Sequence, residues 1–391
     1  MNTERIINSN IDTDLYKITM GQFVYHNFPI LNVGYEFINR GKTIFPDGFG
    51  AKLQNQIELM FEIKLKPEER NFLQGGCNNV LTEDFVNWFS DYQFNPSEIT
   101  INQKGGDLSL HIDGPWKRTI YWEVPLMATI SELYFKETNQ RLDLDWENRA
   151  KQKALLFKAS GAKLADFGSR RRFSYSVHDR IVEIFKDNGQ GSFLGTSNVE
   201  LAMKYNLAPI GTFAHELVMA MAGIYGPEKA NRKVLKLWRE EFNGKLATAL
   251  TDTLTTEVFL RDFDKDLAEI YKTFRQDSGS PEEWTNKIIS HLVSLGIDPL
   301  ERTALYSDSL NPQRVLEIME YTKNRIQVLF GIGTNLTNDV DARPLNMVIK
   351  LLYLESDKGK RQGLCKISDD PGKISGDKLA IIEWPKKLGL T

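Results

Sequence analysis

The sequence of 391 residues is poor in cysteine, with only Cys77 and Cys365. Two cysteines cannot form a disulfide framework or a cysteine-based metal cluster, and this scarcity favours a reducing compartment. Long apolar runs are missing as well, since none approaches the ~18–20 residues that a membrane-spanning helix requires. The first residues, MNTERIINSN, lack the apolar region of a signal peptide. We therefore expect a cytoplasmic protein that does not enter a membrane.

Neither sign of charge dominates the sequence. Its 49 lysines and arginines against 52 aspartates and glutamates give a formal net charge of −3. This balance argues against a general binder of nucleic acids or of membrane surfaces. The chain is also longer than the ~250–300 residues that a single hydrophobic core usually supports, so about two domains are expected.

The local patterns change in character near residue 145. The first part mixes helices with short strands, with an opening helix capped by Asp12, Thr13 or Asp14, helices at 49–61, 82–92 and 124–136, and strands at 98–103 and 107–113. Strand-like runs then alternate with helical patterns, at 162–167, 192–196, 207–212, 246–252, 272–276, 303–307, 326–331 and 345–354. Such alternation is typical of parallel βαβ units, and seven or eight of them fit a barrel better than an open sheet.

The segment at 162–185 carries the clearest functional signal. An apolar-biased run reaches Gly168, three arginines follow (Arg170, Arg171 and Arg172), and an amphipathic pattern begins at Ser174. This order indicates a strand, a tight turn and a helix, with cations at the carboxyl end of the strand, where α/β folds bind ligands. Because a guanidinium binds two oxygens of a carboxylate or phosphate at once, the turn favours an anion. A solvated basic turn is the alternative.

Polar groups also follow the other expected strands, in GTS at 195–197, GTFAHE at 211–216, FRQDSG at 274–279, YSD at 306–308 and FGIGT at 330–334. Taken singly, His215 could be an ordinary buried histidine, Asp277 a turn former and the 331–333 Gly-x-Gly a simple turn. Taken together at one end of parallel strands, they predict a site for a phosphate and a sugar. Aspartates there can hold Mg²⁺ or bind ribose hydroxyls.

These motifs, in order, resemble the nicotinate phosphoribosyltransferase family. The resemblance runs from about residue 10 to the C-terminus and is carried by TDLYK at 13–17, GPWKRTIYWEVPLMATISE at 114–132, DFGSRRRFS at 166–174, GTSN at 195–198, GTFAHE at 211–216, FRQDSG at 274–279, YSDSL at 306–310 and FGIGTNLTND at 330–339.

The resemblance implies an enzyme that forms nicotinate mononucleotide and diphosphate from nicotinate and 5-phosphoribosyl 1-diphosphate, in NAD salvage. It implies Mg²⁺, coupled ATP hydrolysis and a homodimer with a shared active site. The implied fold is an irregular, incomplete α/β barrel with an N-terminal α+β domain. We accordingly predict an N-terminal domain at 1–145, a barrel domain with the active site at 146–355, and a C-terminal segment at 356–391 that returns to the N-terminal domain.

The resemblance also implies roles for single residues. His215 becomes a phosphohistidine, Asp277 shares the catalytic role, and Asp277 and Asp308 hold ribose hydroxyls directly or through Mg²⁺. Phe167 stacks on one face of the pyridine, and Tyr16, supplied by the neighbouring subunit, stacks on the other. Arg170 and Arg275 bind carboxylate or phosphate, and Gly331, Gly333 and Thr334 hold the 5-phosphate. Arg171 and Arg172 could either be exposed to solvent or contact a phosphate, and the sequence does not decide between these. The role of the segment at 368–378 is also left open.

Ser197 bears on the choice of substrate. The related nicotinamide enzyme carries an aspartate at the matching position, and a carboxylate would repel the carboxylate of nicotinate. A neutral serine, expected to cap the following helix, therefore favours nicotinate. The alternatives are a related nicotinamide or quinolinate phosphoribosyltransferase, a non-catalytic phosphate-sugar sensor, and a carrier that passes phosphate from His215 to another protein.

Overall fold

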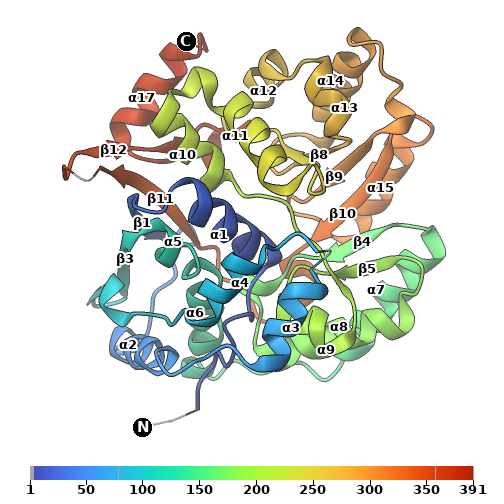
Figure 1. Ribbon diagram of the computed structural model, residues 1–391. Coiled ribbons are helices and arrows are strands. Elements are labelled where there is room, and N and C mark those ends of the chain that lie inside the picture. The colour runs from blue at the N-terminus through green and yellow to red at the C-terminus, as the bar shows by residue number, and fades with distance from the viewer. Residues whose placement is uncertain (1–3, 78, 357, 391) are drawn as a thin grey trace. The chain divides into compact units, whose positions relative to one another are not determined.

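The structure is a computed structural model that describes residues 4–77, 79–356 and 358–390 (Figure 1). The chain divides into two compact units, each made of separate stretches. Unit 1 comprises Met1–Ala159, Ala165–Gly211 and Ile332–Lys350, and unit 2 comprises Ser160–Leu164, Thr212–Gly331 and Leu351–Thr391. The predicted boundaries near 145 and 355 do not coincide with this division, in which 356–391 groups with the stretch that contains His215. The boundaries near 145 and 355 remain a prediction of where separately folding domains begin and end.

Unit 1 contains the N-terminal helices and strands and the first parallel strands. Its helices are α1 (Leu15–Asn27), α2 (Phe49–Met60), α3 (Pro67–Gly75), α4 (Glu83–Ser90), α5 (Trp116–Thr119), α6 (Glu123–Glu137), α7 (Trp146–Ser160, whose last residue falls in unit 2), α8 (Tyr175–Asn188), α9 (Val199–Tyr205) and α16 (Thr334–Thr337). Its strands are β1 (Asn32–Ile38), β2 (Ile99–Lys104), β3 (Asp107–Pro115), β4 (Leu164–Asp166, whose first residue falls in unit 2), β5 (Phe193–Thr196) and β6 (Ala208–Pro209).

Unit 2 contains the remaining parallel strands and the C-terminal elements. Its helices are α10 (His215–Tyr225), α11 (Pro227–Phe242), α12 (Thr256–Asp262), α13 (Lys265–Ile270), α14 (Pro281–Ser294), α15 (Pro312–Thr322) and α17 (Lys378–Lys387). Its strands are β7 (Thr248–Leu250), β8 (Thr273–Gln276), β9 (Thr303–Tyr306), β10 (Gln327–Ile332, whose last residue falls in unit 1), β11 (Val348–Glu355, from Leu351 on), β12 (Arg361–Gly363), β13 (Cys365–Lys366) and β14 (Ser375–Gly376).

The N-terminal hairpin is formed as expected. Strands β2 and β3 pair antiparallel from Ile99 opposite Ile112 to Lys104 opposite Asp107, and β1 pairs antiparallel with β3. Gly105 lies in the turn with a φ of +55°, a conformation that glycine adopts without a steric penalty. Leu108, Leu110 and Ile112 alternate with more exposed residues and are buried. The sheet therefore buries one face, as its period-two pattern predicts.

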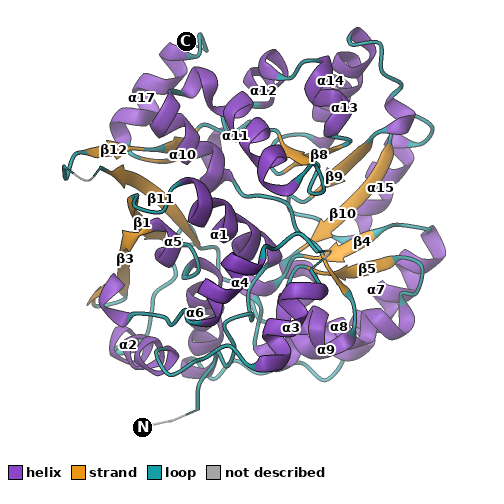
Figure 2. Ribbon diagram, in the orientation of Figure 1, coloured by secondary structure: helices purple, strands orange, loops and turns teal. Residues whose placement is uncertain are grey.

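The parallel sheet has seven strands, β4 to β10, one fewer than a complete barrel (Figure 2). Within unit 1 the order is β6-β5-β4, and within unit 2 it is β10-β9-β8-β7. In unit 2, Thr273 of β8 lies opposite Thr248 on one side and Thr303 on the other. The expected fold class, an incomplete α/β barrel with an N-terminal α+β part, is confirmed.

The eighth expected strand, at 345–354, is not part of this parallel sheet. It corresponds to β11, which belongs to the five-stranded sheet and pairs antiparallel with β12 in unit 2, with Tyr353 opposite Gly363. An apolar run alone does not decide which sheet a strand joins, because strands of both sheets are rich in the same residues.

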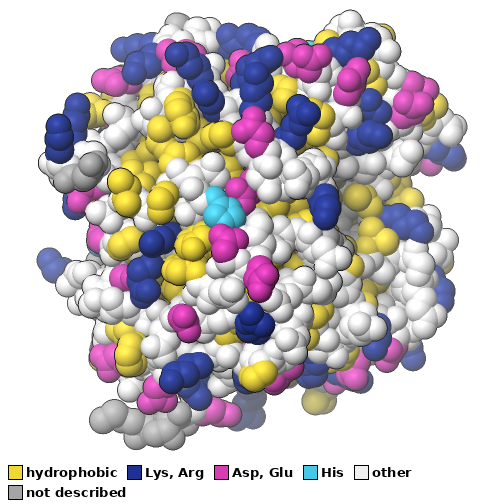
Figure 3. Space-filling view, in the orientation of Figure 1, with side chains coloured by type: hydrophobic (Ala, Val, Ile, Leu, Met, Phe, Trp, Pro, Cys, Tyr) yellow, Lys and Arg dark blue, Asp and Glu magenta, His cyan; other side chains and the backbone are white. Residues whose placement is uncertain are grey.

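Helix caps follow the sequence closely. The Ser174 hydroxyl accepts a hydrogen bond from the Val177 amide at the start of α8, Ser280 does the same for α14, and Asn311 for α15. Each cap satisfies an amide that the first turn leaves without an intrahelical partner. In the described part of the chain, no helix is long and apolar enough to cross a membrane. Basic and acidic side chains are interspersed on the face that Figure 3 shows.

A buried ion pair fixes the arginine turn of unit 1. The two terminal nitrogens of the Arg172 guanidinium, Nη1 and Nη2, each lie 2.6 Å from one oxygen of Asp12, and both side chains are buried. Arg172 is therefore neither solvated nor available to a phosphate, which resolves one of the two open arginines as structural. Asn198 also donates to Asp12, at 2.8 Å.

Replacing Arg172 with methionine is expected to lower the free energy of unfolding by about 3–5 kcal/mol, because Asp12 would stay buried without its counter-charge. The matched control is Arg180→Met, since Arg180 forms an exposed pair with Glu147 and such pairs contribute about 0–1 kcal/mol. Urea unfolding of both variants measures the difference. Equal, small losses would contradict a structural role for Arg172.

Candidate active site

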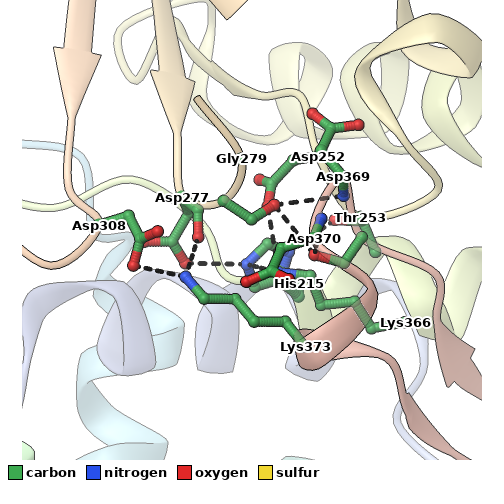
Figure 4. A network of polar contacts seen from close by, with 12 residues as sticks. His215, Asp252, Thr253, Asp277, Gly279, Asp308, Lys366, Asp369, Asp370 and Lys373 are labelled. Carbon is green, nitrogen blue, oxygen red and sulfur yellow. Dashed lines mark hydrogen bonds and ion pairs between the residues drawn. The ribbon is translucent and has the colours of Figure 1, made fainter. Parts of the chain in front are cut away.

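His215 lies at the start of α10 in unit 2, after the strand-end sequence Gly211-Thr212-Phe213-Ala214. Its Nδ1 is 2.9 Å from the Thr253 hydroxyl, and its Nε2 is 2.9 Å from Asp277 Oδ2 and 3.0 Å from Lys366 Nζ (Figure 4). Nε2 thus faces both a carboxylate and an ammonium group. It can donate to Asp277 in one tautomer and accept from Lys366 in the other.

Burial and charge together decide the protonation of this histidine. Desolvation and the nearby Lys366 ammonium lower the pKa of His215 to about 4, although Asp252 and Asp277 oppose the shift. The imidazole is therefore neutral at pH 7. A neutral imidazole offers an unprotonated nitrogen to an electrophile such as a phosphoryl group.

The two aspartates beside His215 are ionised. Asp252 is fully buried, and its Oδ2 accepts from Lys366 at 3.1 Å and from Ser278. Burial opposes ionisation of Asp252, yet Lys366 and His215 lower its pKa. For Asp277, the positive charge of Arg275 and the hydrogen bond to His215 outweigh burial and hold the pKa well below its usual range. Lys366 and Arg275 thus compensate the two carboxylates.

Arg275 and Asp308 belong to the same polar group. The Arg275 guanidinium donates to Ser307 at 2.9 Å and lies 3.4 Å from Asp277. Asp308 pairs with Lys373, whose Nζ also donates to the Asp277 carbonyl oxygen at 2.9 Å. The structure therefore brings four predicted residues of unit 2 together: His215, Arg275, Asp277 and Asp308. Gly331, the fifth, lies at the end of β10 in the same unit.

The segment at 368–378 contacts this group within unit 2. The Ser368 hydroxyl lies 2.9 Å from the Ser278 hydroxyl, and the Asp369 carboxylate accepts from the Thr256 amide and hydroxyl. With Lys373 these contacts link the segment to the residues around Asp277, as Figure 4 shows. They give a physical account of a segment whose role the sequence leaves open.

In unit 1, Ser197 does not cap α9. Asn198 does, accepting from the Leu201 amide at 3.0 Å, so the expected cap is wrong by one residue. Ser197 is buried, and its hydroxyl donates to Asp14 Oδ1 at 2.7 Å, as does Ser169 at 2.6 Å. Burial raises the pKa of Asp14 despite these hydrogen bonds. The neutral side chain of Ser197 thus lies against the buried carboxyl group of Asp14.

The remaining predicted residues of unit 1 lie near α1 and the end of β4. Tyr16 and Arg170 both contact Glu123, at 3.4 Å and 3.3 Å. The Phe167 amide donates to the Ile332 carbonyl at 2.8 Å, and its ring is half-buried. A Cβ at Gly333 would lie 3.3 Å from the Phe167 carbonyl oxygen. The loop and the strand end therefore approach closely, and Thr334 then begins the four-residue helix α16.

The donor set in unit 2 suits Mg²⁺ in part. Asp277 and Asp308 supply hard carboxylate oxygens, and Oδ1 of buried Asp252 has no hydrogen-bond partner. Among the described residues, however, no three His, Cys, Asp or Glu side chains are grouped to hold a metal. These residues fit a cation that takes most of its ligands from water and substrate oxygens, as Mg²⁺ usually does.

Several proteins of known name are similar to this chain in sequence and in structure. Sequence profiles described as the nicotinate phosphoribosyltransferase family and its N-terminal domain match residues 162–384 and 11–131. The nicotinate phosphoribosyltransferases of Chromohalobacter salexigens and Desulforapulum autotrophicum are 41% and 43% identical, over 98% and 95% of this chain and 98% and 96% of theirs. The crystal structure of the Porphyromonas gingivalis nicotinate phosphoribosyltransferase superposes with a TM-score of 0.96 at 37% identity, covering 98% of this chain and 100% of that one.

The chain belongs to the nicotinate phosphoribosyltransferase family. It is an enzyme of that family, as the resemblance of its motifs predicts. Two residues of unit 1, Asp14 and Glu123, and three of unit 2, Asp252, Lys366 and Lys373, lie beside the predicted residues of their own unit but were not predicted from the sequence. Asp252 lies two residues after the buried end of β7, so its position at a strand end was a usable signal. Lys366 and Lys373 carry no such signal in the sequence, since each lies more than 60 residues from its partners along the chain.

Replacing Lys366 with methionine is expected to raise the pKa of His215 from about 4 toward its ordinary 6.5, because it removes the neighbouring cation. In the unmodified protein, His215 binds a proton near pH 6.5 when the chain is unfolded but only near pH 4 when it is folded. Protonation of the unfolded chain therefore lowers the free energy of unfolding as the pH falls from about 6.5 to about 4. NMR titration of ¹⁵N-labelled histidine measures the shift, with Lys373→Met as the control. A pKa that stays near 4 would show that burial alone sets it.

Proposed function

We propose that the enzyme transfers the phosphoribosyl group of 5-phosphoribosyl 1-diphosphate to the ring nitrogen of nicotinate, and that ATP hydrolysis drives this transfer through phosphorylation of His215. The reaction supplies nicotinate mononucleotide for NAD salvage. The observation that carries the proposal is the neutral, buried imidazole among Asp252, Asp277 and Lys366, in a chain of the nicotinate phosphoribosyltransferase family.

In the proposed coupling step, an unprotonated ring nitrogen of His215 attacks the γ-phosphorus of ATP. The N–P bond forms, the bond to the bridging oxygen breaks, and ADP leaves with the electron pair. The nearby Lys366 ammonium stabilises the added negative charge of the phosphohistidine. Water later cleaves the N–P bond and releases phosphate.

In the transfer step, the bond between ribose C1 and the diphosphate breaks as the pyridine nitrogen bonds to C1. The electron pair leaves with the diphosphate, and charge develops on the ribose ring. The protein's task is then to orient the two substrates and exclude water rather than to supply a nucleophile. Asp277 and Asp308 suit the ribose hydroxyls, and Arg275 suits an anionic oxygen.

Asp277 and Asp308 would hold Mg²⁺ in this proposal, because their carboxylates are hard oxygen ligands. When bound, it neutralises the charge of the leaving diphosphate. Tyr16 and Phe167 are proposed to cover the two faces of the pyridine, with Arg170 near its carboxylate, and Gly331, Gly333 and Thr334 to hold the 5-phosphate. We further propose a homodimer with a shared active site.

Ser197 supports nicotinate over nicotinamide. An aspartate at this position would place a second carboxylate beside buried Asp14, and the added negative charge would repel the carboxylate of nicotinate. The test is product formation from 5-phosphoribosyl 1-diphosphate and Mg²⁺ with nicotinate, nicotinamide or quinolinate, each with and without ATP. We expect nicotinate to be the only one of the three pyridines that is converted, and we expect nicotinate mononucleotide to form faster when ATP is present. Turnover of another pyridine would contradict the specificity, and no turnover would favour a phosphate-sugar sensor.

Replacing His215 with alanine is expected to abolish the stimulation by ATP and to leave weak, ATP-independent turnover, because the substrate-binding groups remain. Initial rates at saturating nicotinate, with and without ATP, measure this. His291→Ala is the control, since His291 contacts the Phe263 carbonyl away from the aspartates that surround His215. A normal ATP response in His215→Ala would overturn the phosphohistidine.

A further inference from the structure

Glu123, the first residue of α6, lies at the centre of a polar group in unit 1. It belongs to the motif at 114–132, to which the proposed chemistry assigns no role. Its side chain is only 9% exposed. Oε2 lies 2.7 Å from Lys17 Nζ and 3.4 Å from the Tyr16 hydroxyl, and Oε1 lies 3.3 Å from Arg170 Nη1. One carboxylate thus contacts two of the residues predicted to bind nicotinate.

The charges around Glu123 are unequal. Lys17, Arg170 and Lys350 all stabilise the charged carboxylate and hold the pKa of Glu123 at about 2, against the effect of burial. Glu123 is therefore ionised at any pH at which the protein works. Three cations thus lie near this carboxylate, and the negative charge of Glu123 holds them close together.

Lys17 connects the carboxylate to the aromatic side chains. Its side chain is fully buried, and its Nζ lies 5.6 Å from the centre of the Tyr16 ring and 6.0 Å from that of Tyr35. Glu123 therefore fixes Tyr16 twice, through its hydroxyl and through the ammonium beside its ring. Cation–π contacts of this kind orient a ring as well as bind it.

Arg170 is a partly exposed member of the group, with a side chain that is 36% exposed. Holding a long side chain in place before the substrate arrives removes part of the entropic cost of binding. A guanidinium carries five N–H donors, so one contact to a carboxylate can set its plane while other donors face an anion.

We propose that Glu123 is a positioning residue for nicotinate, which orients Arg170 for the carboxylate of the substrate and Tyr16 for the pyridine ring in the site shared with the neighbouring subunit. This inference rests on the proposed function. Glu123 also neutralises buried Lys17, so removing the carboxylate alone would lower stability and binding together. The two effects are separated by removing both charges.

The test compares Glu123→Gln, the double variant Lys17→Met/Glu123→Gln, and Glu123→Asp. The double variant is expected to recover the melting temperature that Glu123→Gln loses, because no uncompensated charge stays buried. Its KM for nicotinate is expected to stay raised by about tenfold, with kcat changed much less, because substrate-orienting contacts are lost. Glu123→Asp, which keeps the charge, should give an intermediate KM.

Glu98→Gln is the matched control, because Glu98 is an equally buried carboxylate of unit 1 that pairs with Arg118 at 2.7 Å. It should lower the melting temperature and leave the KM for nicotinate unchanged. A normal KM in an active Lys17→Met/Glu123→Gln variant would overturn the inference and leave the proposed function intact. If that variant does not fold, Glu123→Asp decides by the same measurement. No product from the unmodified enzyme would overturn both.

Discussion

The site in unit 2 depends on a division of charge among buried groups. Lys366 and Arg275 keep Asp252 and Asp277 ionised, while burial and the same Lys366 keep His215 neutral. Each buried carboxylate has a cation nearby, and the histidine, which has both kinds of neighbour, loses its proton. This arrangement keeps a ring nitrogen of His215 unprotonated at neutral pH, whereas an isolated surface histidine would be protonated more readily.

Unit 1 uses buried carboxylates in a similar way. Asp12 holds Arg172 and thereby the turn that carries the arginines, and Glu123 holds Arg170 on the same turn. Asp12 gives Arg172 a structural role, and Glu123 holds Arg170 in the place from which we propose that it binds substrate. Burying an ion pair adds little net stability compared with a well-packed apolar pair, but it fixes orientation, because breaking it is costly. Both units therefore position their polar groups by pairing charges within the core.

Much of the fold and part of the site were predictable from the sequence. The positions of the parallel strands, the caps at Ser174, Ser280 and Asn311, and the strand-end placement of His215 and Asp277 are local properties, which turn chemistry and hydrophobic period encode. The partners of these residues are not local. Lys366 is 151 residues from His215, and no sequence period links them. The cap at 197 failed because Ser197 and Asn198 are both good caps, and only the buried carboxyl group of Asp14 separates their roles.

The most direct test of this account is whether ATP phosphorylates His215. The purified enzyme is incubated with γ-labelled ATP and Mg²⁺, and the label is located by peptide mass spectrometry under alkaline conditions, which preserve phosphohistidine. We predict one acid-labile phosphoryl group on His215, lost in His215→Ala and discharged faster when nicotinate and 5-phosphoribosyl 1-diphosphate are added. Label on another residue, or ATP-stimulated turnover without any phosphorylated histidine, would contradict the account.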